Sequence, residues 1–129
     1  MTREQRRAQL VYERLKPYKD RDQSYRDNYG SMALRFPALV RSAGLVQALA
    51  FVDSRGKDEH RDFVHDLAAV LAKLNHQTAK DREQAFQWLF EQARKADLPH
   101  YLHLTRETLA VADWFKRFAQ SILKAKGVD

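Results

Sequence analysis

The most apolar stretch of the chain decides the fold, and from Arg35 to Val52 it reads RFPALVRSAGLVQALAFV. Leading into it, four large side chains recur at helical spacing and share one face: Tyr25, Tyr29, Met32 and Phe36. Pro37 then removes a backbone hydrogen bond, and Gly44 permits a left-handed helix stop. The segment Leu45 to Val52 is apolar on nearly every side, which is typical of a short helix buried all round. We therefore predict a helix, a proline-bent turn and a central helix wrapped by the other elements.

Two arginines interrupt this apolar stretch and exclude a membrane-spanning helix, which needs about 20 uninterrupted apolar residues. If Arg35 and Arg41 are exposed at the bend, they point outward beside a buried surface. If they are buried, each needs an acidic partner such as Asp53 or Asp27, because an unpaired internal charge is very costly. We favour exposure.

Length and composition predict one all-α domain spanning residues 1–129, a compact bundle of about five to six helices with a buried central helix. The absence of cysteine excludes disulfides, a zinc finger and a thiol nucleophile. Only 4 glycines and 3 prolines are available for turns, which argues against an all-β fold. The first fifteen residues are charged and lack an apolar signal core, so we expect a cytoplasmic protein.

Capping residues set the predicted helix boundaries. Suitable side chains stand before each helix: Thr2, Asp20 or Asp22, Asp58, Thr78 (in a capping box with Asp81) and Asp97. The first helix should end near Lys16, before Pro17. The later helices should end near Asn75, Ala96 and Lys124 or Lys126.

The formal net charge of +6 favours a polyanionic partner, nucleic acid first and an acidic membrane second, although an ordinary soluble protein can also have a basic surface. Arg3, Arg7 and Arg14 fall on one strip of the first helix. Their guanidinium groups either bind successive phosphates of a nucleic acid or are solvated, in which case the aliphatic parts of the side chains cover the edge of the core. On the last helix, Arg106 and Arg117 share the outer face.

Three other side chains lie beside the apolar stripe that each helix is predicted to bury, or at its edge. Lys116 is at the edge of the last helix's stripe. Trp88 and Trp114 lie off the main stripes, where they could stack on bases, fill a pocket on a neighbouring protein or pack under a loop. We favour the protein neighbour for both tryptophans.

The five histidines raise the question of a metal or nuclease site. His100, His103 and Glu107 share a helical face and are acceptable zinc ligands, but no fourth ligand is evident. His60 and His65 lie on different sides of one helix and cannot act as a pair. Phosphate-loop, nucleophile-elbow and HExxH motifs are absent from the sequence. We therefore expect no enzyme activity, no metal, no cofactor and no small-molecule substrate.

Two blocks of the sequence carry a resemblance to a known family. The first combines Pro37, the pair Gly44-Leu45, Gln47 and an Ala-Phe ending, and the second reads TRETLAVADWFKRFAQSIL over 105–123. Both resemble the small α-helical subunit of the Cmr complex, the type III-B CRISPR RNA-guided effector. Ala43 departs from the family pattern, in which a polar residue, often Asn, precedes the glycine.

The resemblance implies a non-catalytic subunit that stacks with copies of itself, contacts other Cmr subunits and helps hold target RNA along the guide–target duplex. Larger subunits would carry guide binding and cleavage, and no membrane would be involved. Arg41, Lys116 and Arg117 lie in the matching blocks and are the first candidates for RNA or subunit contacts. Arg35, Arg14 and Arg106 come next, on charge placement only.

Two alternative functions remain open. One is a free-standing basic helical nucleic-acid-binding module, which would need a short recognition helix with exposed base-reading residues. The other is a small His-dependent nuclease.

Overall fold

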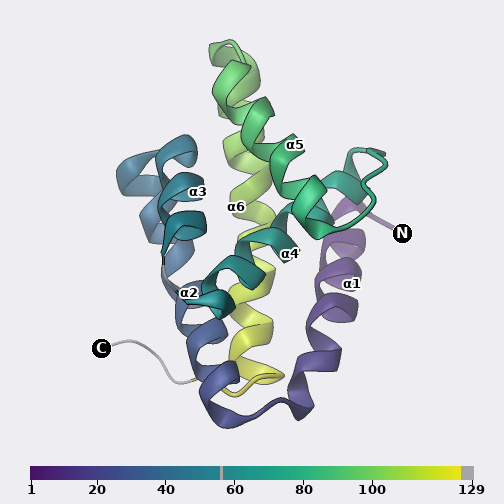
Figure 1. Ribbon diagram of the computed structural model, residues 1–129. Coiled ribbons are helices and arrows are strands. Elements are labelled where there is room, and N and C mark those ends of the chain that lie inside the picture. The colour runs from purple at the N-terminus through teal and green to yellow at the C-terminus, as the bar shows by residue number, and fades with distance from the viewer. Residues whose placement is uncertain (56, 126–129) are drawn as a thin grey trace.

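The computed structural model describes residues 1–55 and 57–125, and these form six α-helices, one short 3₁₀ helix and no strand (Figure 1). The all-α prediction is confirmed. In chain order the elements are α1 (Arg3–Leu15), the 3₁₀ helix η1 (Lys16–Asp20), α2 (Gln23–Ala43), α3 (Leu45–Ser54), α4 (Asp58–Leu74), α5 (Arg82–Lys95) and α6 (Leu98–Ser121).

Side-chain caps begin four of the six helices, because each satisfies backbone N–H groups that the first turn leaves free. Thr2 and Gln5 form a reciprocal capping box at α1. Asp22 accepts a hydrogen bond from the first turn of α2, and Asp97 does the same for α6. Asp81 caps α5. The predicted starts at Thr2, Asp22 and Asp97 are confirmed.

Two predicted starts are wrong. The cap position of α4 is Lys57, and Asp58 is instead the first helical residue, where its charge still suits the positive end of the helix. Helix α5 begins at Arg82 and not near Ala79, because the carboxylate of Asp81 accepts the Gln84 amide at 2.8 Å. The aspartate is itself the cap and not the third residue of a capping box.

The second helix continues through Pro37, where the sequence predicts a bent turn. It remains helical to Ala43, although a proline removes the hydrogen bond to the carbonyl four residues earlier, that of Ala33. The turn lies at Gly44, whose φ of 88° is accessible to glycine at little cost. The Gly44 amide still donates to the Val40 carbonyl at 2.9 Å, which completes the last turn of α2.

A side chain from α6 fixes the start of α3. Gly44 offers no capping side chain, and the hydroxyl of Tyr101 accepts the Val46 amide at 3.2 Å. This long-range contact satisfies one of the backbone N–H groups that the first turn of α3 leaves free. Ala43 is therefore compatible with the turn.

A buried central helix is present, but it is α4 and not the segment Leu45–Val52. Helix α4 contacts all five other α-helices. Helix α3 packs with one side only and leaves Gln47 and Phe51 exposed on the other. Length explains the difference: the 10 residues of α3 span about 15 Å, too little to cross the core, whereas the 17 residues of α4 span about 26 Å.

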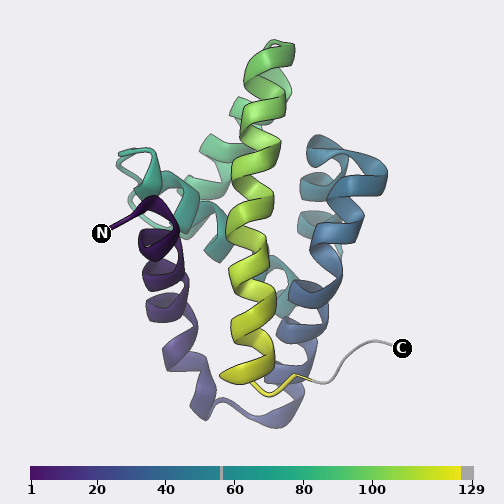
Figure 2. The same cartoon turned by 180° about the vertical axis from the view of Figure 1, so that it is seen from behind.

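The long helix α6 runs between α1 on one side and α2 on the other, with α4 crossing behind it (Figure 2). The predicted core faces are confirmed on the helices that flank it: Tyr25, Tyr29, Met32 and Phe36 on α2, and Phe63, Leu67, Val70, Leu71 and Leu74 on α4, are all buried. Helix α6 ends at Ser121, before the predicted Lys124. The other predicted end, Lys126, lies outside the described residues.

A buried carboxylate joins α4 to four other elements. Asp66 has no solvent exposure. Its Oδ1 atom accepts from Arg14 Nε of α1 at 2.8 Å and from Arg82 Nη1 of α5 at 3.1 Å. Its Oδ2 atom accepts from the hydroxyls of Tyr18 in η1 (2.8 Å) and Tyr29 in α2 (2.7 Å). A buried charge of this kind is stable only because each oxygen is paired with donors.

We expect Asp66→Asn to lower the free energy of unfolding by about 3 kcal/mol. The asparagine keeps one acceptor oxygen, but its NH₂ group faces two of the four donors that bind Asp66. Those two donors then lose their acceptor. Urea denaturation would measure the loss. The matched control is Asp58→Asn, which removes an exposed ion pair with Arg61 and should cost less than about 1 kcal/mol. Equal losses in the two variants would contradict this role for Asp66.

The tyrosines at this carboxylate predict a loss of stability in alkali. Burial first, and then the charge of Asp66, raises the pKa of Tyr18 to about 12 and the pKa of Tyr29 well above its usual value. Unfolded tyrosines ionise at about pH 10. Stability from these groups is therefore complete below about pH 10 and is lost as the pH rises through the folded-state pKa. Urea midpoints across this range should fall less steeply for Tyr29→Phe than for the unchanged protein, and equal slopes would contradict the assignment.

Candidate nucleic-acid interface

Helix α6 carries its apolar residues on one side, which leaves its other side uncovered between α1 and α2 (Figure 2). Val111, Phe115 and Ala119 are buried against the core. Arg106 and Arg117 are exposed on the outer side. They are three turns apart and so lie along one line of the helix, about 16 Å from one another. The outer-face prediction is confirmed for these two arginines.

Neighbouring cations gather near the carboxyl end of this line. Lys116 and Arg117 surround a shallow hollow of about 290 Å³ together with Asp113 and Gln120. Both cations are exposed, and the ion pairs found among the described residues involve other side chains. One carboxylate between two cations leaves this part of α6 with a net positive charge.

The two arginines of the apolar stretch are both exposed, as expected. Arg35 donates from Nε to the Ser31 carbonyl at 3.4 Å and forms no ion pair with an acid in the described part of the chain. Arg41 lies three residues before the turn at Gly44. The acidic partners considered for them are not used, because α2 turns both guanidinium groups toward solvent.

The candidate cations do not form one continuous patch. Helices α2 and α6 run antiparallel: Gly30 of α2 approaches Ala119, whereas the Tyr101 hydroxyl meets the start of α3. Arg41 therefore lies near the amino end of α6, with Arg106. Lys116 and Arg117 lie near its carboxyl end.

Arg14 differs from the other candidate cations because its guanidinium already binds a carboxylate. Its Nε donates to buried Asp66, and its side chain is 36% exposed. Arg3 and Arg7, on the same strip of α1, bind Glu107 of α6. The strip that we considered as a phosphate ladder thus makes ion pairs inside the bundle.

The two tryptophans are half-buried and pack against the core. The indole nitrogen of Trp114 donates to Glu4 of α1 at 3.0 Å, and its ring lies 5.4 Å from that of Phe118. Trp88 makes no comparable hydrogen bond in the described residues. Each tryptophan is partly held within the chain and leaves only part of its ring for a neighbour.

Glu107, considered above as a metal ligand with His100 and His103, faces α1 and binds Arg3 and Arg7. Burial acts to raise the pKa of Glu107, but the hydrogen bonds from the two arginines outweigh it and hold this pKa below its usual value. Within residues 1–55 and 57–125, no group of three His, Cys, Asp or Glu side chains is arranged to hold a metal ion.

One cluster of cations, at the end of the bundle where η1 lies, is not predicted from the sequence. A hollow of about 410 Å³ is lined there by Lys16, Lys19, Arg26 and Lys124, beside Tyr12. These residues come from α1, η1, α2 and the segment after α6, so no helical periodicity relates them. The sequence signals this cluster only weakly, because residues 1–28 hold eight Lys and Arg against five Asp and Glu.

None of the described helices is long and apolar enough to cross a membrane. The sequence pattern of the CRISPR-associated protein family Cmr5 matches residues 3–122, which is nearly the whole chain. The chain belongs to the Cmr5 family. The resemblance seen in the two sequence blocks is thereby confirmed.

A curated Cmr5 relative, the "CRISPR system Cmr subunit Cmr5" of Thermus thermophilus, is 48% identical over 123 residues. The match covers 95% of this chain and 97% of the relative. A crystal structure of a CRISPR-associated Cmr5 family protein from the same species superposes with a TM-score of 0.77, at 48% identity and the same coverage. The helical bundle is thus a Cmr5 fold.

The different surroundings of Arg14 and Arg117 predict different effects on stability. Arg14→Ala removes one donor from a buried carboxylate and should lower the free energy of unfolding by about 2 kcal/mol. Arg117→Ala should change it by no more than about 0.5 kcal/mol, because this side chain is exposed and makes no ion pair in the described residues. Urea denaturation of the two variants tests the distinction. A loss at Arg117 as large as that at Arg14 would contradict it.

Proposed function

We propose that this chain is a non-catalytic small subunit of a type III-B CRISPR Cmr effector complex. The observation that carries the proposal is the match to the Cmr5 family over residues 3–122. A relative named as a Cmr subunit, 48% identical over almost its full length, supports the same assignment. The partners on this proposal are other Cmr subunits, copies of the chain itself, the CRISPR RNA and the target RNA.

Within such a complex, the exposed cations of α2 and α6 would contact the target RNA or a neighbouring subunit. Arg41, Lys116 and Arg117 are solvent-exposed and lie in the blocks that resemble the family. For single-stranded RNA, each neutralised phosphate contributes about −0.7 to the slope of log K against log salt. A few contacts on one copy bind weakly, but copies stacked in a filament add their contacts.

The surroundings of the histidines support a non-catalytic role. The ring of His65 is 2.9 Å from Asp53 Oδ1, and His60 is buried. Burial first, and the charge of Arg35 second, lower the pKa of His60, which favours its neutral form. Neither ring lines any of five hollows found among the described residues, whereas general acid–base cleavage requires such groups beside a bound substrate.

Charge reversal on α6 tests the RNA contact. Lys116→Glu with Arg117→Glu should weaken target-RNA capture by the assembled complex and make the salt slope less steep by about 0.7 for each phosphate no longer neutralised. Filter binding of labelled target RNA at several salt concentrations would measure both quantities. Circular dichroism should show unchanged helix content, because both side chains are exposed.

The matched control replaces one lysine and one arginine elsewhere, Lys73→Glu with Arg94→Glu on α4 and α5, and should leave capture unchanged. Normal capture by the α6 variant would contradict the assigned contacts. The pure chain should also leave labelled RNA intact with and without divalent metal. Clean cleavage would favour a nuclease, and equal RNA retention without other Cmr subunits would favour a free-standing nucleic-acid-binding module.

A further inference from the structure

Two hollows meet at Tyr12 on the side of the bundle where α1 packs against α6, and the first is basic. It has a volume of about 410 Å³ and is lined by Lys16, Lys19, Arg26 and Lys124. Within the described residues, no acidic side chain lines it. The carboxyl end of α6 adds only about half a negative charge, so the hollow keeps a net positive charge.

Arg26 is held in this hollow without being neutralised. Its Nε donates to the Arg21 carbonyl at 3.0 Å, and its two terminal nitrogens donate to Gln23 Oε1 at 2.9 Å and to the Leu123 carbonyl at 3.4 Å. All three acceptors are uncharged. Arg3, Arg7 and Arg14 of α1, in contrast, each bind a carboxylate. The Arg26 guanidinium is therefore fixed in position and keeps its full charge for an anion.

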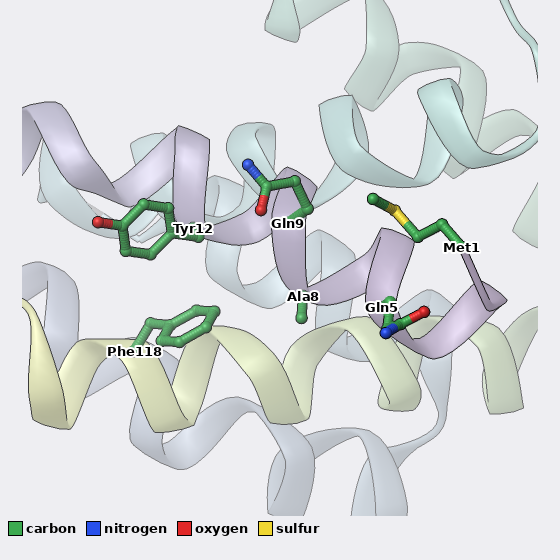
Figure 3. A pocket seen from close by; sticks show the side chains of 6 residues that line it. All are labelled: Met1, Gln5, Ala8, Gln9, Tyr12 and Phe118. Carbon is green, nitrogen blue, oxygen red and sulfur yellow. The ribbon is translucent and has the colours of Figure 1, made fainter.

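The second hollow is mainly apolar and lies along α1 (Figure 3). Its volume is about 720 Å³. Tyr12 and Phe118 face one another at one end, Met1 and Gln5 lie at the other, and Gln9 projects from α1 between them. The Tyr12 ring meets Phe118 edge-on, at 5.8 Å between centroids and 73° between planes, and is 41% exposed.

We propose that these two hollows form a binding site for one nucleotide of single-stranded RNA. The phosphate lies among Lys19, Arg26 and Lys124, and the base rests against Tyr12. Gln5 Oε1 accepts from the Thr2 amide and Gln9 Nε2 donates to Glu13, each at 2.8 Å, which leaves Gln5 Nε2 to donate to the edge of the base and Gln9 Oε1 to accept from it. This site goes beyond the contacts of Lys116 and Arg117 proposed above, since it uses other residues from other elements.

The combination of groups favours single-stranded RNA over other anionic partners. A phosphate or an acidic peptide would use the cations but not the exposed aromatic ring. A base has a π-face that stacks on tyrosine, and its phosphate lies within the reach of adjoining cations. Bases within a duplex remain stacked on their neighbours and cannot reach Tyr12.

Nuclear magnetic resonance of the isotopically labelled full chain tests the site directly. Titration with a short oligouridylate up to millimolar concentration should shift the side-chain amides of Gln5 and Gln9 and the backbone amides of Tyr12 and Lys19. An equal concentration of the same RNA annealed to its complement should not shift them. Absence of shifts with the single strand, or equal shifts with the duplex, would overturn the proposal.

Two variants separate the roles of ring and charge. Tyr12→Ala should weaken oligouridylate binding about tenfold, the range expected for loss of one stacked base. Lys19→Gln with Lys124→Gln should make the salt slope less steep by about 0.7 for each phosphate no longer neutralised. The matched control, Lys73→Gln with Lys80→Gln, removes the same charge at another hollow, which shares no lining residue with these two, and should preserve binding.

The outcomes also separate this site from the proposed function. Shifts confined to Lys116 and Arg117 would overturn the nucleotide site while leaving the α6 contact intact. Inorganic polyphosphate is the remaining probe. Polyphosphate binding as tight as that of oligouridylate, combined with no effect of Tyr12→Ala, would show a contact with charge alone and would overturn the site. Equal weakening by the lysine variant and its control would do the same.

Discussion

The buried carboxylate of Asp66 is the constraint on which the rest of the bundle depends. A charge without solvent exposure is tolerated only if its partners are in place, and here they arrive from α1, η1, α2 and α5. Apolar contacts bring these elements together but allow small slides and rotations. Hydrogen bonds of 2.7 to 3.1 Å to one side chain restrict them.

This constraint divides the cations of a basic protein into two groups. One group consists of four arginines that are paired with four carboxylates of the chain: Arg14 and Arg82 with Asp66 and Asp62, and Arg3 and Arg7 with Glu107 and Glu4. The positive charge left for a partner is carried by exposed cations, which include those of α2 and α6 and those of the hollow beside η1. The number of arginines in the sequence therefore overstates the positive charge at the surface, because several arginines form ion pairs within the bundle.

Local signals in the sequence predict much of the fold. Thr2, Asp22 and Asp97 are recognisable as caps because a capping side chain acts within one turn of its own helix. The buried face of α2 follows from helical periodicity. The continuation of α2 through Pro37 is not predicted. The proline removes one backbone hydrogen bond, but tertiary packing can offset that loss and keep the segment helical.

Contacts between distant residues account for the rest. The sequence offers no means to pair Arg14 with Asp66, 52 positions away, or to place Trp114 beside Glu4, 110 positions away. Apolarity favours Leu45–Val52 for the central position, whereas the structure gives it to α4, which is long enough to reach every neighbour. Of the candidate residues, exposure of Arg35, Arg41, Arg106 and Arg117 is predicted from their helical faces. The hollow around Arg26 is not, since it is assembled by tertiary structure.

The first helix, α1, packs against the last helix, α6, so the two ends of the helical sequence hold one another in place (Figure 2). Arg3 and Arg7 neutralise Glu107, whose side chain is only 8% exposed. Removing the chain through Arg7 would therefore leave Glu107 of α6, the longest of the described helices, without either partner. Tags and fusions on this protein are better designed as extensions than as replacements of its opening turn.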